Sequence, residues 1–120
     1  MAVRRIVADL AAARPAEAVA FYGGVLGLRV AMDLGWVVTF EAEGASAAPQ
    51  VSVLSEGGSG APVPDLSVEV DDLDAVLARA RAAGLAVEYG PAAEPWGVRR
   101  FFVRDPCGRL VNVLAHDGGP

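Results

Sequence analysis

An internal repeat constrains this chain more than any other feature. Three matches recur in the same order at a spacing of about 60 residues: Gly27-Leu28 with Gly84-Leu85, Trp36 with Trp96, and Val51-Ser52-Val53-Leu54 with Val111-Asn112-Val113-Leu114. A chain of 120 residues is long enough for one core and short for two. We therefore expect one domain made of two modules, residues 1–54 and 65–116, joined by a Gly/Pro-rich linker over residues 55–64.

Hydrophobic periodicity and turn residues predict the same element order in both modules, namely a strand, a helix and three further strands. In the first module the expected strands are residues 3–7, 28–32, 36–41 and 50–54, with a helix that begins at Pro15 and ends at Gly27. In the second module the expected strands are residues 65–70, 85–89, 98–104 and 110–114, with a helix that is capped by Asp71 or Asp72 and ends at Gly84. This pattern predicts an α+β fold.

The amino-acid composition argues against several classes of protein. Hydrophobic residues make up 53% of the chain, which argues against disorder, and no apolar run approaches the length of a membrane span. The net charge of −5, with no basic cluster longer than a pair, argues against nucleic-acid binding. Cys107 has no second cysteine to pair with, and no targeting segment is visible. We expect a cytoplasmic protein that binds neither nucleic acid nor membranes.

Two short motifs, together with the repeated βαβββ order, give a resemblance to a known family. The helix ending Phe21-Tyr22-Gly23-Gly24-Val25-Leu26-Gly27-Leu28 and the turn Asp105-Pro106-Cys107-Gly108-Arg109 resemble the vicinal oxygen chelate superfamily. This superfamily includes glyoxalase I, extradiol dioxygenases, fosfomycin-resistance enzymes and bleomycin-resistance proteins. The resemblance implies two tandem βαβββ modules whose curved mixed sheets carry helices outside and a concave ligand cup inside. It also implies a homodimer.

The same resemblance implies where a metal would bind. Metal-dependent members carry His, Gln or Glu in the first and last strands of each module, at positions that fall near Val7, Ser52, Asp65 and Asn112 here. Zinc, iron and manganese favour imidazole, thiolate or carboxylate donors, and only Asp65 offers one. His116 follows the last strand, where a solvated position and a role at the rim of the cup both stay open. We therefore expect no metal and no other cofactor.

The expected ligand site rests on aromatic residues in the strands of the cup. Flat rings stack on conjugated molecules, and an asparagine amide can orient a carbonyl or hydroxyl group. The candidate ligand-binding residues are Trp36, Val38, Phe40, Tyr89, Trp96, Arg99, Phe101 and Asn112. Strand alternation separates Arg99 and Phe101 from Arg100 and Phe102, and it leaves open which pair faces the cup.

These features favour a binding protein that sequesters an aromatic or conjugated small molecule, in particular an antibiotic, as the metal-free bleomycin-resistance proteins do. The alternative is a glyoxalase-like lyase, isomerase or dioxygenase with a non-standard metal site, or an acid–base catalyst that uses Asp65, Tyr89, Arg99 or His116. A regulatory domain that binds a metabolite or a protein is a third hypothesis. We expect no catalytic residues under the favoured interpretation.

Overall fold

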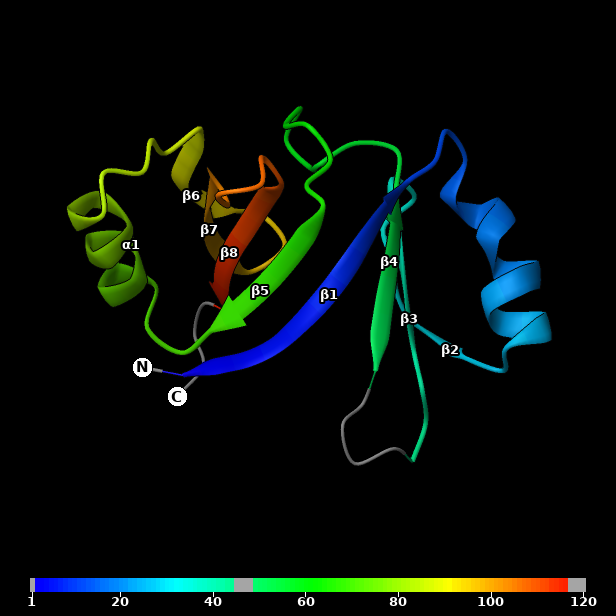
Figure 1. Ribbon diagram of the computed structural model, residues 1–120. Helices are drawn as coiled ribbons and strands as arrows, with labels where there is room; N and C mark the ends of the chain where they lie inside the picture. The colour runs from blue at the N-terminus through cyan, green and yellow to red at the C-terminus, as the bar shows by residue number, and fades with distance from the viewer. Residues whose placement is uncertain (1, 45–48, 117–120) are drawn as a thin grey trace. The chain divides into compact units, whose positions relative to one another are not determined.

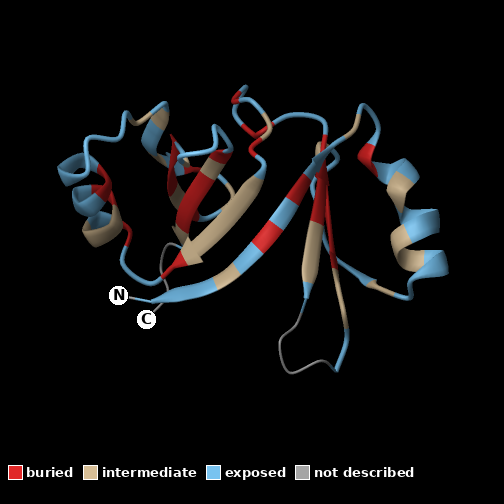
Figure 2. Cartoon of the chain, in the orientation of Figure 1, coloured by how far each residue is buried: buried red, intermediate tan, exposed pale blue. Residues whose placement is uncertain are grey.

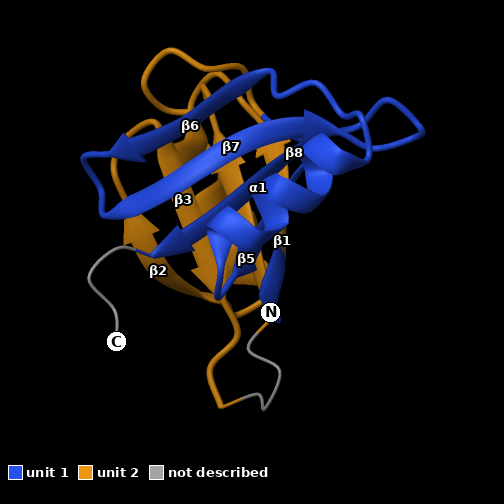
Figure 3. Cartoon of the chain, turned by 90° about the vertical axis from the view of Figure 1, so that its left-hand side faces the viewer, with its two compact units in different colours: residues 1–6, 64–120 blue, residues 7–63 orange. Residues whose placement is uncertain are grey.

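Strands dominate the secondary structure (Figure 1). The computed structural model describes residues 2–44 and 49–116, and within these ranges it contains eight strands, one α-helix, one 3-10 helix and one π-helix. The chain divides into two compact units, which Figure 3 colours separately. Unit 1 comprises residues 1–6 and 64–120, and unit 2 comprises residues 7–63. The predicted mixed α+β fold is confirmed.

Unit 2 has a four-stranded sheet with two short helices. Its elements are most of β1 (Val3–Ala11), η1 (Pro15–Ala18), η2 (Val19–Val25), β2 (Arg29–Asp33), β3 (Val37–Glu41) and β4 (Gln50–Leu54). The strands follow the order β2-β3-β4-β1, in which β4 and β1 are parallel and the other pairs are antiparallel. The loop expected at residues 44–49 lies largely outside the described residues.

Unit 1 repeats this plan. Its elements are β5 (Leu66–Val70), α1 (Leu73–Ala82), β6 (Tyr89–Glu94), β7 (Val98–Arg104) and β8 (Leu110–His116), together with the first residues of β1. The strands follow the order β5-β8-β7-β6, with β5 and β8 parallel and the remaining pairs antiparallel. Residues 55–60 form bends and a turn, and residues 61–64 have no regular secondary structure. The module boundaries expected from the repeat, at residues 1–54 and 65–116, stay a prediction.

The helix α1 begins and ends where its sequence indicates. The Asp72 carboxylate accepts a hydrogen bond from the backbone N–H of Ala75 at 3.0 Å, which satisfies one of the free donors of the first turn. Leu73, Leu77 and Ala80 lie on its buried face. Gly84 follows the helix with φ +79°, a conformation that glycine adopts without steric cost.

The first helix is less regular than the periodicity predicts. Pro15 begins a 3-10 turn, and Val19–Val25 then continues as a π-helix that contains Gly23 and Gly24. Two adjacent glycines weaken the preference for the α-helical form, which is consistent with the irregular geometry. The Tyr22 ring packs on Phe40 with ring centroids 5.3 Å apart.

The prediction of a strand at residues 85–89 is wrong. Residues 85–88 lie outside the strands, and the strand is β6, which carries Pro91. Proline is tolerated there because β6 is the edge strand of its unit. Gly90 is required for close packing, since a Cβ at this position would lie 2.5 Å from the carbonyl oxygen of Arg100.

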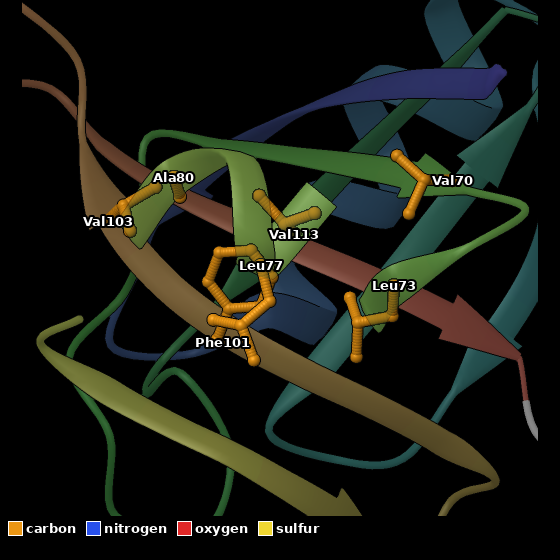
Figure 4. Close-up of a cluster of buried hydrophobic side chains, with 7 residues drawn as sticks. All are labelled: Val70, Leu73, Leu77, Ala80, Phe101, Val103 and Val113. Carbon is orange, nitrogen blue, oxygen red and sulfur yellow. The ribbon is translucent and has the colours of Figure 1, made fainter. Parts of the chain in front are cut away.

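Each unit buries its own hydrophobic cluster between the sheet and the helices, as the red segments of Figure 2 indicate. The unit 1 cluster, shown in Figure 4, consists of Val70, Leu73, Leu77, Ala80, Phe101, Val103 and Val113. The unit 2 cluster consists of Val38, Phe40 and Val53, with Ala12, Ala18, Tyr22, Leu28 and Val51 packed against it. No helix in the described part of the chain is long and apolar enough to cross a membrane.

Phe101 is fully buried in the unit 1 cluster, so its removal tests that core. Phe101→Ala is expected to lower the free energy of unfolding by about 3–5 kcal/mol, because it leaves a cavity under α1. Urea denaturation followed by circular dichroism measures this. Leu34→Ala is the matched control, since that side chain is 44% exposed and its loss should cost about 0.5 kcal/mol or less. Equal losses would contradict the assignment.

Candidate functional site

The two faces of the unit 1 sheet differ in what covers them. On β7, Phe101 and Val103 face α1, so the alternation of side chains turns Arg100 and Phe102 to the other face. We call this second face, the one turned away from α1, the open face of unit 1; the name refers to the absence of a helix on it, because Arg100 and Phe102 are at most 3% exposed. The register of β7 and β8 places Phe102 opposite Asn112, which therefore belongs to the open face as well.

A buried ion pair lies on this open face. The Arg100 Nε donates to Glu94 Oε2 at 2.6 Å, and both side chains are only 4% exposed. The Tyr89 hydroxyl donates to the same carboxylate oxygen at 2.8 Å. A buried charge is tolerated when an opposite charge and hydrogen bonds satisfy it, so these contacts hold the Arg100 guanidinium in a fixed position.

Three aromatic rings surround that guanidinium. The Arg100 Cζ lies 5.1 Å from the ring centroid of Tyr89, 5.0 Å from that of Trp96 and 4.9 Å from that of Phe102. These distances are within the range of cation–π attraction. Phe102 is fully buried, whereas Tyr89 and Trp96 keep part of their surface accessible. We refer to Tyr89, Glu94, Trp96, Arg100 and Phe102 as the Arg100 cluster.

Asn112 adds a polar group beside this cluster. Its side chain is 7% exposed, and its Nδ2 donates to the Ser67 hydroxyl at 3.1 Å. Its Oδ1 is buried and has no hydrogen-bond partner among the described residues. A buried acceptor without a partner is uncommon and costs about 1–3 kcal/mol.

A second set of charges lies further along β5 and β8. Glu69 accepts a hydrogen bond from Arg5 Nε, and its other carboxylate oxygen lies 3.0 Å from His116 Nδ1. Burial raises the pKa of Glu69, but the hydrogen bonds and positive charges of Arg5 and His116 outweigh it and hold that pKa below its ordinary value. His116, expected either in solvent or at the rim, is exposed and contacts Glu69.

The corresponding face of unit 2, turned away from η1 and η2, also carries polar pairs. The Thr39 and Ser52 hydroxyls are 2.7 Å apart and buried, and Asp9 is paired with Ser52 in the β1–β4 register. Glu41 accepts from Arg29 Nη2 at 2.8 Å and also from the side-chain amide of Gln50.

The register changes two of the positions at which the resemblance places a metal. Asp9, and not Val7, lies beside Ser52, and Ser67, and not Asp65, lies beside Asn112. The Asp65 carboxylate instead accepts from the backbone N–H of Leu110 at 2.8 Å, at the start of β8.

The donors at these positions do not fit a zinc-type ion. Each unit offers one hydroxyl, and the second group is a carboxylate in unit 2 and an amide in unit 1, whereas such ions favour imidazole, thiolate and several carboxylates. No group of three His, Cys, Asp or Glu side chains suited to a metal occurs within residues 2–44 and 49–116. We therefore assign no chemistry to a metal in this chain.

The predicted ligand-binding residues separate into two groups. Tyr89 and Trp96 lie together in the Arg100 cluster, and Asn112 lies on the same face. Trp36 is half-buried just before β3 in unit 2.

The other four residues lie on the helix side of their sheets. Val38 and Phe40 are at most 1% exposed in the unit 2 cluster, and Phe101 is in the unit 1 cluster. Arg99 pairs with Asp74 of α1 at 3.3 Å. Because they contribute to packing and to a helix contact, we leave these four out of the candidate site.

The candidate residues predicted from the sequence do not include Arg100, Phe102 or Glu94. The available signal was parity, because Phe102 lies opposite Asn112 across the β7–β8 pair and Arg100 lies two residues away. Cys107 is exposed in the turn before β8, where its backbone N–H donates to Asp105.

Comparison with known proteins gives a match over most of the chain. A family model described as the Glyoxalase/Bleomycin resistance protein/Dioxygenase superfamily matches residues 4–113. No curated protein matches the chain.

Several solved structures share the fold. An NAD-dependent benzaldehyde dehydrogenase from Legionella pneumophila is 14% identical with a TM-score of 0.75, over 94% of this chain and 100% of that one. A superfamily member from Vibrio splendidus 12B01 is 18% identical with a TM-score of 0.65, over 96% and 99%. A variant of Streptomyces coelicolor methylmalonyl-CoA epimerase, in complex with 2-nitronate-propionyl-CoA, is 20% identical with a TM-score of 0.72, over 98% and 100%. At these identities the likeness shows the fold alone.

The buried pair of Arg100 and Glu94 yields a stability prediction. Glu94→Gln removes the carboxylate charge next to a buried guanidinium, so we expect it to lower the free energy of unfolding by about 3–5 kcal/mol in urea denaturation. Glu88→Gln is the matched control. The side chains of its partner Arg104 and of Glu88 are 49% and 39% exposed, so the loss of this pair should cost about 1 kcal/mol or less. Equal effects of the two substitutions would contradict the assignment.

Glu69 yields a pH prediction. Because its folded pKa lies below the ordinary value of 4.5, its ionised form stabilises the fold above that pH. This stabilisation is lost as the pH falls through the folded pKa. Wild-type stability should therefore drop more steeply below pH 4.5 than that of Glu69→Gln, in denaturation curves recorded at several pH values. Parallel profiles for the two proteins would refute this prediction.

Proposed function

Because the chain belongs to the glyoxalase/bleomycin resistance protein/dioxygenase superfamily, we propose that it binds and sequesters a conjugated aromatic small molecule without a metal. An antibiotic is the ligand class we favour. In this proposal the protein holds the molecule away from its target and makes or breaks no covalent bond.

The Arg100 cluster is the observation that carries this proposal. It combines two partly accessible rings, Tyr89 and Trp96, with a guanidinium that a buried carboxylate holds in place. Flat rings bind other flat conjugated systems by offset stacking. The Arg100 side chain is only 4% exposed, so it supports the rings and does not itself offer a face to the ligand. Glu94 and the rings already hold Arg100 in place. Binding of a ligand therefore costs little conformational entropy of these side chains.

The polar groups at the four metal positions support binding without a metal. Ser52 is hydrogen-bonded to Thr39, and Ser67 is hydrogen-bonded to Asn112, so these groups form pairs within their own units. Such groups suit hydrogen bonding to a neutral molecule better than coordination of a transition metal.

To keep an antibiotic away from its target, the protein needs a dissociation constant of about 1 μM or lower, which corresponds to a binding free energy of about −8 kcal/mol. Burial of about 300 Å² of apolar ligand surface supplies about 7–8 kcal/mol before association costs. Ring stacking adds about 0.5–1.5 kcal/mol for each pair. We therefore expect a ligand large enough to contain several fused or conjugated rings.

The epimerase and dehydrogenase named above are enzymes, and the donor set of this chain gives no reason to transfer their activities. The following test distinguishes a binding protein from an enzyme. Purified protein is titrated with conjugated antibiotics, bleomycin among them, while tryptophan fluorescence and heat of binding are recorded. Saturable binding without added metal supports the proposal. Absence of binding by every compound would overturn it, and lyase, isomerase or dioxygenase activity after addition of Mn, Fe, Ni or Zn would then support the enzymatic alternative.

We also propose that the chain acts as a homodimer. The helix η2 has no buried residue, and Phe21, Val25 and Leu26 are more than half exposed. Clustered exposed apolar side chains favour association. Sedimentation velocity at micromolar concentration should give a mass of two chains, and a monomer there would refute the dimer.

Trp96 provides the mutational test of the binding surface. Trp96→Ala is expected to weaken binding of a conjugated antibiotic about tenfold, because it removes the largest accessible ring of the cluster. Trp96→Phe should keep most of the affinity, since a smaller ring remains. Calorimetry measures both affinities, and circular dichroism checks the fold. Unchanged affinity in the folded Trp96→Ala protein would exclude this surface.

A further inference from the structure

We infer that the ligand is uncharged and donates a hydrogen bond from its ring system to Asn112 Oδ1. This inference rests on the proposed function, and it specifies the chemical class of the ligand. It predicts a phenolic hydroxyl, a ring N–H or an amide N–H directly attached to the conjugated system.

The first step is the unsatisfied acceptor. Asn112 Oδ1 is buried without a partner, while Nδ2 of the same amide is bound to the Ser67 hydroxyl. That bond fixes the plane of the amide and the direction in which Oδ1 presents its lone pairs. Leaving such an oxygen unpaired is unfavourable, so a donor that reaches it gains binding free energy.

The second step is the position of that acceptor. In the β7–β8 register Asn112 lies directly opposite Phe102, whose ring lies 4.9 Å from the Arg100 guanidinium and 5.1 Å from the Tyr89 ring. Paired residues across neighbouring strands have Cβ atoms about 4.5–5.5 Å apart. The Asn112 side chain therefore lies beside that of Phe102. Because Oδ1 itself is buried, a donor has to enter between these side chains, and a flat ring does this more readily than a long flexible chain.

The third step is charge. Arg100 and Glu94 are the buried charged groups of the open face within the described part of unit 1, and they neutralise each other at 2.6 Å. An anionic ligand would compete with Glu94 for Arg100, and the chain as a whole carries a net charge of −5. A cation would meet the guanidinium at the centre of the rings. An uncharged ligand avoids both repulsions.

The experiment uses three naphthalene probes that differ in one group: 2-naphthol with a ring hydroxyl, 2-methoxynaphthalene without a donor, and 2-naphthoate with a negative charge. Each is titrated into wild-type protein, Asn112→Leu, Asn112→Ala and Asn112→Asp by calorimetry at pH 7. Circular dichroism verifies that each variant is folded, and Asn112→Ala serves in place of Asn112→Leu if leucine does not fit.

Wild-type protein should bind 2-naphthol about tenfold more tightly than 2-methoxynaphthalene, and it should bind 2-naphthoate most weakly. Asn112→Leu and Asn112→Ala should lose the preference for 2-naphthol while still binding 2-methoxynaphthalene. Asn112→Asp retains an acceptor at the same place, with Ser67 now donating to it, and should keep the preference. A preference that survives in Asn112→Leu or Asn112→Ala, or a wild-type protein that favours 2-naphthoate, would overturn the inference.

This design separates two kinds of failure. Naphthalenes that bind equally well with and without a donor leave the proposed function standing and refute the inference alone. Failure of every conjugated compound, the antibiotics included, refutes the proposed function. If an antibiotic binds and the naphthalenes do not, the antibiotic and its O- or N-methylated form take the place of the first two probes, with the same expected ratios.

Discussion

The ion pair between Arg100 and Glu94 determines how the open face of unit 1 is organised. A guanidinium that is almost fully buried needs a carboxylate within hydrogen-bond distance, and the β6–β7 hairpin supplies one because Glu94 lies six residues before Arg100. Tyr89 hydrogen-bonds to the same carboxylate, and three rings pack on the cation. Such pairs add little net stability compared with an apolar core, but in this unit the hydrogen bonds and ring contacts hold the neighbouring side chains in one arrangement. Here that arrangement holds the accessible rings at fixed positions.

Local signals were sufficient for most elements of the fold. The strands at residues 50–54 and 98–104 have the predicted bounds, because valine and phenylalanine fill them and turn residues flank them. Of the two residues expected to cap α1, Asp71 and Asp72, the structure shows Asp72 as the cap. The strand β6 was missed because Pro91 is a strand breaker by local rules, and only the strand order shows that it lies at an edge. The irregular η2 contains Gly23 and Gly24, and the hydrophobic periodicity alone does not reveal the π-helical turns there.

The candidate site was only partly predictable, for a reason that lies in strand geometry. Alternation shows that Arg99 and Phe101 share one face and that Arg100 and Phe102 share the other. It does not show which face the helix covers, since α1 is distant in sequence from β7. Phe40 and Phe101 were therefore expected in the site and lie in the cores. Asn112 is among the predicted residues because the family resemblance places a metal position there, whereas its bond to Ser67 and its unsatisfied oxygen follow from the strand register.

The division of β1 between the units bears on the order in which the chain folds during synthesis. Unit 2 is continuous over residues 7–63, so all of it leaves the ribosome before most of unit 1 exists. The first residues of the chain bond to partners made much later, since the backbone N–H of Ala2 donates to the Asp71 carboxylate. Domains generally fold as units in the order of synthesis, and contacts distant in sequence form late. The N-terminal residues of β1 therefore stay without their unit 1 contacts until the second half of the protein emerges.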